Sequence, residues 1–217
     1  MPKYLALGNG NILICMDEYA QIRDFYYPSV GKENHVEGHR HKLGVFVDNK
    51  FSWSFDGTWD IDIKYKKETL VSFIKLKNKD LKIEILIEAT VHPKKDIFIN
   101  KLTINNLENK ERDIKIFFNQ HFHVTGANIG DTAYYEPYSH SIIYYKGKRY
   151  FLIDGVVNNK SFSDYATGVA DFQNREGTYR DAEDGKLSKN PIEHGSVDST
   201  IGFDVKLKPN NKSILYY

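Results

Sequence analysis

Regular alternation of apolar and polar residues along most of the chain is the feature that most limits its fold. In Leu81–Ala89 (LKIEILIEA) an apolar residue recurs at every second position, which places these residues on one face of a strand. Ile97–Asn106 and Asp113–Val124 repeat the pattern on either side of the turn-like LENKER and predict a long antiparallel hairpin. Asp48-Asn49 and Lys146-Gly147 each predict a tight turn between two further strands.

The remaining strands complete the prediction of an all-β fold. Helical spacing is best in Asp171–Tyr179, where we expect no more than one or two turns. Internal repeats, low-complexity tracts and proline-rich linkers are absent from the sequence, which favours one domain over residues 1–217. We therefore predict a large antiparallel two-layer sandwich with at most one or two short helices. Its further strands are expected at Ile12–Met16, Gln21–Tyr26, Asp60–Tyr65, Leu70–Lys77, Ser199–Leu207 and Lys212–Tyr217.

Composition narrows the possible partners and the compartment. The 30 basic and 29 acidic residues leave a net charge of +1, so we expect neither nucleic acid nor a membrane as partner. The N-terminal MPKYLALGNG lacks the apolar core of a signal peptide, and we expect a cytoplasmic protein. The single cysteine, Cys15, lies in the apolar run NILICM and is predicted to be buried and inert.

Two histidine pairs raise the question of a metal site. His39 and His41 form one H-x-H pair, and His121 and His123 form another. On a strand, residues i and i+2 point to the same face, so each pair could offer two imidazoles to one ion, with a third from His35 or from the other pair. Neither pair is followed by the glutamate of a cupin-like site. We therefore predict no metal and no cofactor.

An acidic segment near the C-terminus raises the question of catalysis. Glycosidases hold two carboxyl groups at a set distance across the sugar ring. Acidic residues in a loop rich in Gly, Asn and Pro are, however, common as turn and strand-edge caps. We therefore predict no catalytic residue in Thr178–Ser199, although this segment carries Asp181, Glu183, Asp184, Glu193 and Asp198.

Aromatic residues in loops predict a recognition surface. Tyrosines beside Gly, Pro and Asn on a rigid sandwich are typical of surfaces that bind sugar or protein. Trp53 and Trp59 could stack on a sugar, although the alternating WSF favours a core position for Trp53. The tyrosines concerned are Tyr26, Tyr27, Tyr134, Tyr135 and Tyr138.

Three blocks of sequence resemble a known family. GNGNILICMDEYAQIRDFYYPSVGKENH, KLTINNLENKERDIKIFFNQHFHV and TYRDAEDGKLSKNPIEHGSVDS together resemble the N-terminal domain of prokaryotic glucoamylase-type glycoside hydrolases, a group that includes glucodextranases and related trehalases. The resemblance implies a β-supersandwich like that of galactose mutarotase, joined by a linker to an (α/α)6 barrel that carries both catalytic glutamates. This sequence contains no set of helices for such a barrel, so those glutamates have no counterpart here.

The resemblance implies a non-catalytic domain whose partner is the helical barrel of the same enzyme, with α-glucan as a further candidate ligand. The apolar NKSILYY at the end, up to Tyr217, is expected to continue into the linker. Arg23–Phe46, Tyr134–Tyr138 and Thr178–Ser199 are expected to form the contact surface with the barrel, because aromatic and hydrogen-bonding side chains suit such an interface. The candidates are Arg23, Asp24, Tyr26, Tyr27, His35, His39, Tyr135, Tyr138, Arg180 and Asp181.

Two alternatives stay open. Galactose-mutarotase-like enzymes use a histidine and a carboxylate for proton transfer at the anomeric carbon, and His121 or His123 with Glu193 could serve in this way. A free-standing carbohydrate-binding module is the other alternative.

Overall fold

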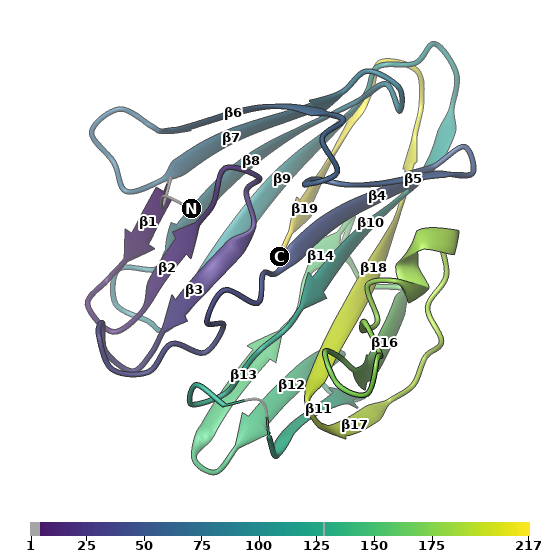
Figure 1. Cartoon of the computed structure of the whole chain (residues 1–217). Coiled ribbons are helices and arrows are strands. Elements are labelled where there is room, and N and C mark those ends of the chain that lie inside the picture. Colours follow the sequence, from purple (N-terminus) through teal and green to yellow (C-terminus); the bar gives the residue numbers. More distant parts are fainter. Residues whose placement is uncertain (1–4, 128) are drawn as a thin grey trace.

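The computed structural model describes residues 5–127 and 129–217, and their regular structure is almost entirely β (Figure 1). Two large antiparallel sheets form the sandwich. The seven-stranded sheet has the order β15 (Lys160–Ser161), β14 (Val156–Val157), β19 (Lys212–Tyr216), β9 (Phe98–Asn106), β8 (Ile83–Val91), β7 (Ser72–Asn78) and β6 (Trp59–Tyr65). The five-stranded sheet has the order β16 (Asp164–Val169), β18 (Val197–Leu207), β10 (Arg112–Gln120), β4 (Lys42–Val47) and β5 (Lys50–Trp53).

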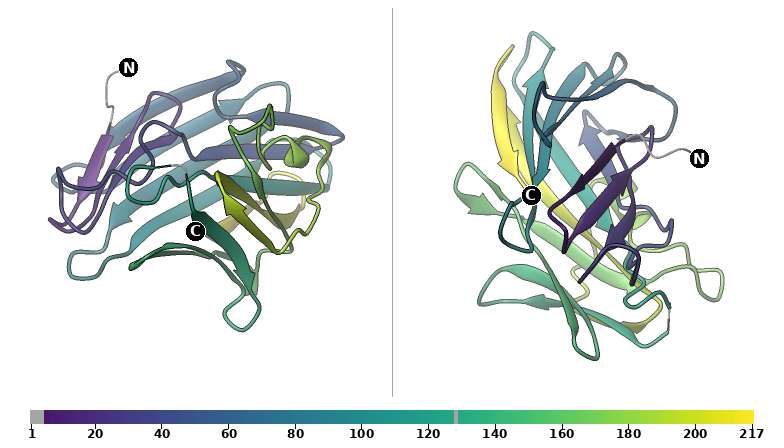
Figure 2. Two further views of the ribbon diagram at one scale, coloured as in Figure 1. Left: turned by 60° about the horizontal axis from the view of Figure 1, so that its bottom comes forward. Right: turned by 90° about the vertical axis from the view of Figure 1, so that its left-hand side faces the viewer.

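Two smaller antiparallel sheets flank this sandwich. The three-stranded sheet consists of β1 (Leu5–Gly8), β2 (Leu13–Met16) and β3 (Ile22–Tyr26), and it is drawn in purple in Figures 1 and 2. The four-stranded sheet has the order β13 (Arg149–Ile153), β12 (Ser141–Lys146), β11 (Asp131–Glu136) and β17 (Ile192–Gly195). The predicted fold class, a large antiparallel β-sandwich, is therefore confirmed.

Alternation along the strands builds the core. On β8, Ile83, Ile85 and Ile87 are buried and the residues between them are half-buried, as the period of two predicts. These side chains belong to one apolar cluster with the inward residues of the five-stranded sheet, such as Ile114 and Ile116 of β10. Burial of two facing sheet surfaces is what stabilises a sandwich of this kind.

One predicted pairing is wrong. Ile97–Asn106 forms β9, and Asp113–Val124 forms β10 only as far as Gln120, so the last four residues predicted for this strand lie outside it. The two strands do not pair as a hairpin. β9 pairs with β8 and β19, whereas β10 pairs with β4 and β18 of the other sheet. The chain therefore crosses from one sheet to the other between β9 and β10, and the apolar faces of these two strands meet across the core.

The predicted tight turns are confirmed. Asp48 and Asn49 join β4 to β5 with φ of 52° and 58°, and Gly147 lies at φ 57° between β12 and β13. The other strands predicted in the first 80 residues and at the C-terminal end are observed within one or two residues of the expected bounds.

The predicted helical segment is wrong. Asp171–Tyr179 contains a β-bridge between Phe172 and Arg175, and Asp171, Gln173 and Asn174 have positive φ, which a right-handed helix does not permit. The one helix among the described residues is a short 3-10 turn, η1, at Asp181–Asp184. It ends at a glycine, Gly185, with φ of 83°.

No helix in residues 5–127 and 129–217 has the length and apolar character needed to span a membrane. Residues 1–4, the start of the N-terminal stretch used in predicting a cytoplasmic location, lie outside the described residues.

Candidate functional site

A buried polar network lies on the outer face of the five-stranded sheet. Asn119 of β10 pairs in register with Lys42 of β4 on one side and with β18 on the other. Its amide nitrogen donates to Asp198 Oδ2 at 2.8 Å, and its amide oxygen accepts from Lys42 Nζ at 3.2 Å. The backbone N–H of Thr178 also donates to the Asp198 carboxylate, at 2.8 and 2.9 Å.

Burial shifts the pKa values of the ionisable groups in this network. It raises the pKa of the Asp198 carboxyl to about 6, against the hydrogen bonds that lower it, and it lowers the pKa of Lys42. Lys42 Nζ also lies 4.7 Å from the centre of the Tyr179 ring. The network therefore joins Arg23–Phe46 to Thr178–Ser199, two of the three segments predicted to share a surface.

Three histidines from distant segments converge beside this network. We call His39, His121 and His123 the histidine cluster. His121 and His123 follow β10, and their Nε2 atoms are 3.2 Å apart. His39, from the connection between β3 and β4, stacks on the His123 ring with centroids 3.7 Å apart and lies edge-on to His121. Metal-binding atoms of the three side chains all lie within 4.8 Å of one another.

Asp171 is the carboxylate that the fold brings to the histidine cluster. Its Oδ2 lies 3.2 Å from His39 Nδ1 and 3.7 Å from His121 Nδ1. Burial, followed by the charges of neighbouring histidines, lowers the pKa of His121 to about 2 and that of His123 to about 4. Both imidazoles are therefore neutral at neutral pH, the form in which histidine binds metals or accepts protons.

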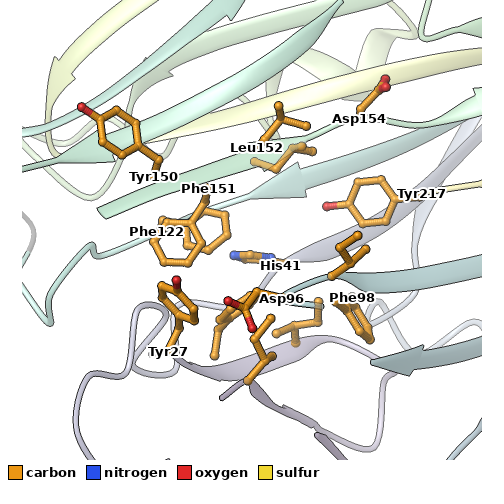
Figure 3. A pocket seen from close by; sticks show the side chains of 15 residues that line it. Tyr27, His41, Asp96, Phe98, Phe122, Tyr150, Phe151, Leu152, Asp154 and Tyr217 are labelled. Atoms are coloured by element: carbon orange, nitrogen blue, oxygen red, sulfur yellow. The ribbon is translucent and has the colours of Figure 1, made fainter. Parts of the chain in front are cut away.

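His41 is turned away from its H-x-H partner His39. Its ring packs edge-on against Phe122 at 4.6 Å and lines a cavity of about 430 Å³ (Figure 3). Tyr27 and Phe151 lie on other sides of this cavity, and Asp96 supplies a carboxylate. Burial lowers the pKa of His41 to about 3. The aromatic cavity has the size and mainly apolar lining of a small-ligand site.

Two predicted interface residues form part of the internal scaffold instead of an open surface. The His35 imidazole is fully buried, with Nδ1 accepting the Thr125 N–H at 2.9 Å and Nε2 lying 2.8 Å from the Tyr27 carbonyl oxygen. These contacts require the proton on Nε2, which then donates to Tyr27. Asp24 is buried on β3 and accepts from Asn34 Nδ2 at 2.7 Å.

Three other residues predicted for the interface lie on β3 or directly after it. Arg23 and Tyr26 are half-buried on β3, and the guanidinium Nε of Arg23 lies 3.5 Å from Asp24 Oδ2. Tyr27 follows β3 and lines the aromatic cavity.

The remaining predicted interface residues differ in exposure. Tyr138 is 98% exposed, in the turn between β11 and β12. Tyr135 stacks on Tyr165 with centroids 4.2 Å apart. Arg180 is exposed and paired with Glu176 and Glu183, while Asp181 accepts the Ser188 N–H at 2.9 Å.

Both tryptophans and the cysteine are buried. Trp53 packs in a small cluster with Phe117, which confirms the core position predicted for it. Trp59 is also buried, and its indole N–H donates to Ser52 Oγ at 2.8 Å, so its predicted alternative of stacking on sugar has no exposed ring face to use. Cys15 is buried, as predicted.

Among the described residues, no hydrogen bond or ion pair joins Glu193 to His121 or His123, the two histidines that could pair with it in the mutarotase alternative. Glu193 sits on β17, where its carboxylate accepts the N–H of His194 at 3.1 Å. The side chains of His121 and His123 instead contact each other, His39 and Asp171.

An exposed aromatic and apolar surface on the four-stranded sheet was missed in the sequence. Cross-strand register places its members on one face, because Tyr145 opposes Tyr150, Ile143 opposes Leu152, and Tyr134 opposes both Ile143 and Ile192. Tyr150, Leu152 and Ile192 are each more than half exposed. We call this surface the tyrosine face; it consists of Tyr134, Ile143, Tyr145, Tyr150, Leu152 and Ile192.

A signal for the tyrosine face is present in the sequence. SIIYYK and RYFLI are apolar at consecutive positions, so both faces of β12 and β13 carry apolar side chains. The inner face, with Tyr144 and Phe151, joins the core. Strands with two apolar faces are usually covered on both sides, whereas the outer face of this sheet is exposed.

Comparison with known proteins shows which proteins the chain resembles in sequence and in fold. A glycosyl hydrolase of Methanocaldococcus jannaschii, itself described as uncharacterized, is 28% identical over 202 residues, which are 93% of this chain and 31% of the relative. A crystal structure of a bacterial glucoamylase complexed with acarbose matches 99% of this chain with a TM-score of 0.75 and 14% identity. The expected resemblance is confirmed at this level: in sequence to a glycosyl hydrolase, and in fold to a bacterial glucoamylase. The chain spans about a third of each of these proteins, 31% and 32%, and no family model matches it.

Proposed function

We propose that the chain is a non-catalytic β-supersandwich module of a glucoamylase-type α-glucan hydrolase, and that it supports the folding and packing of that enzyme's helical catalytic barrel. The observation that carries the proposal is the coverage. Nearly the whole chain matches a glycosyl hydrolase and a glucoamylase, yet it accounts for only 31% and 32% of their lengths. A module of this extent leaves room for a catalytic domain elsewhere in the enzyme.

The tyrosine face supports a docking role. Contiguous exposed apolar side chains on a rigid sheet are characteristic of surfaces that another protein layer covers. We propose that the barrel contacts this face. The exposed members of the set predicted from the sequence, among them Tyr138 and Arg180, form a second candidate contact.

Activity assays on the isolated chain test the proposal. With malto-oligosaccharides as substrate, we expect no release of glucose above background. Polarimetry on freshly dissolved α-glucose and α-galactose tests the mutarotase alternative, and we expect no acceleration of mutarotation. Hydrolysis or mutarotation by the isolated chain would contradict a non-catalytic role.

The aromatic cavity favours a second candidate function, carbohydrate binding. Its aromatic rings and the carboxylate of Asp96 could supply the stacking faces and hydrogen bonds that a pyranose ring requires. Calorimetric titration with maltotriose tests this candidate. Binding that Tyr27→Ala weakens would favour it, and absence of heat at millimolar maltotriose would exclude a useful affinity.

A further inference from the structure

We propose that His39, His121 and His123 bind one divalent transition-metal ion, with Zn²⁺ the best match, and that this ion links the β3–β4 connection to the end of β10. The proposal concerns the isolated chain and does not depend on its role in a hydrolase. Histidine nitrogens are among the preferred ligands of Zn²⁺, which accepts three protein ligands and one water.

The distance between the two buried imidazoles fits a shared ion. Two Zn–N bonds of about 2.0–2.1 Å at a tetrahedral angle separate the two nitrogens by about 3.3 Å. The Nε2 atoms of His121 and His123 are 3.2 Å apart. Both side chains are almost completely buried, so this spacing is held by the packing of the residues that follow β10.

Asp171 orients the ligands. Its carboxylate faces Nδ1 of His121 and of His39, which favours the tautomers carrying a proton on Nδ1. For His121 this tautomer turns the Nε2 lone pair toward His123. A carboxylate behind a ligand histidine is the usual outer contact at zinc sites.

His39 supplies the third ligand from the open side. Its side chain is 35% exposed and that of Asp171 is 52% exposed, so solvent reaches the histidine cluster from this direction. A turn of the His39 ring from its present stacking on His123 would direct a nitrogen to the ion. The same opening admits the ion and the water that would complete its coordination. His41 takes no part, because its ring packs on Phe122 and lines the aromatic cavity.

Without an ion, the histidine cluster has one other explanation, in which one Nε2–H donates a hydrogen bond to the other Nε2. The two explanations differ in whether they require the His39 imidazole. A hydrogen bond between His121 and His123 needs no third imidazole, whereas the metal site loses a ligand when His39 is removed. His39→Ala therefore separates them, and its partial exposure makes the substitution compatible with folding.

Calorimetric titration of the chelator-treated chain with Zn²⁺ tests the site. We expect one ion per chain, together with a rise in the unfolding temperature that grows with Zn²⁺ concentration. His39→Ala and His123→Ala should each weaken binding by at least about 10-fold, and Asp171→Asn by about 10-fold. His194→Ala, which removes an exposed imidazole on β17, is the matched control and should bind as the wild type does.

Co²⁺ provides an independent readout. In a tetrahedral site with histidine ligands, Co²⁺ should give visible absorption that is much stronger than that of the hydrated ion and is lost in His39→Ala. Absence of Zn²⁺ binding, or equal affinity in the wild type, His39→Ala and His123→Ala, would overturn the proposal. If His123→Ala fails to fold, the comparison of His39→Ala with His194→Ala decides.

Discussion

Replacement of His35 by leucine separates a scaffold role from an interface role. The buried imidazole accepts from Thr125 N–H and donates to the Tyr27 carbonyl, and it packs against Phe151 with ring centroids 4.7 Å apart. Leucine has a similar volume but satisfies neither hydrogen-bonding group. Each buried group left without a partner costs about 1–3 kcal/mol, while leucine retains apolar contact. We expect His35→Leu to lower the free energy of unfolding by about 3 kcal/mol.

Equilibrium unfolding of the isolated chain in urea at pH 7 measures this loss. His194→Leu is the control, because its side chain is exposed on β17 and makes a single hydrogen bond, with Thr132 Oγ1 at 2.8 Å, and we expect a loss of no more than about 1 kcal/mol. If His35 acts mainly in an interface with another domain, His35→Leu would match the control. A loss below about 1 kcal/mol would refute the reasoning from the two hydrogen bonds.

Three further predictions concern the polar network, the tyrosine face and the turn after η1. Burial raises the pKa of Asp198 from 3.8 to about 6, so ionisation of this group lowers stability as pH rises through that range. In urea unfolding, lowering the pH from 7 to 5 should therefore raise the free energy of unfolding of the wild type relative to that of Asp198→Asn by about 1 kcal/mol. A difference between the two proteins that is the same at pH 5 and pH 7 would contradict this. We expect the isolated chain to self-associate through the uncovered tyrosine face in sedimentation velocity experiments. Leu152→Glu should reduce this association, whereas Tyr138→Lys, outside the tyrosine face, should not; equal effects would count against that face. Gly185→Ala places a Cβ 2.8 Å from the ring of Phe46 on β4, at a residue whose φ is positive. In thermal unfolding it should lower the free energy of unfolding by about 2 kcal/mol. The loss should be larger than that of Gly57→Ala, where φ is also positive but the space around the Cβ is open.

Local patterns were sufficient for the strands and tight turns. The alternation in Leu81–Ala89 and the residues Asp48-Asn49 act within a few positions, so the sequence predicts them directly. The same local pattern was not enough to pair Ile97–Asn106 with its partners. Pairing depends on which apolar faces meet across the core, and the following strand, Arg112–Gln120, joined the opposite sheet.

The candidate sites also combine features that a local sequence pattern predicts with features that depend on the tertiary structure. Each H-x-H pair predicts two imidazoles on one face, and this holds for His121 and His123, whose Nε2 atoms face each other. His39 and His41 instead separate, one toward the histidine cluster and one into the aromatic cavity, because His41 precedes β4 and packs on Phe122. No local pattern contains that difference.

The sequence by itself determined that the chain is made of strands and that it resembles part of a glucoamylase-type hydrolase, because periodicity and short blocks of residues carry that information. Only the tertiary structure decided which residues from distant segments meet. The convergence of His39 with His121 and His123, and the exposure of the tyrosine face, both follow from how the sheets pack. Packing of this kind is set by long-range contacts over the whole core, which short stretches of sequence do not specify.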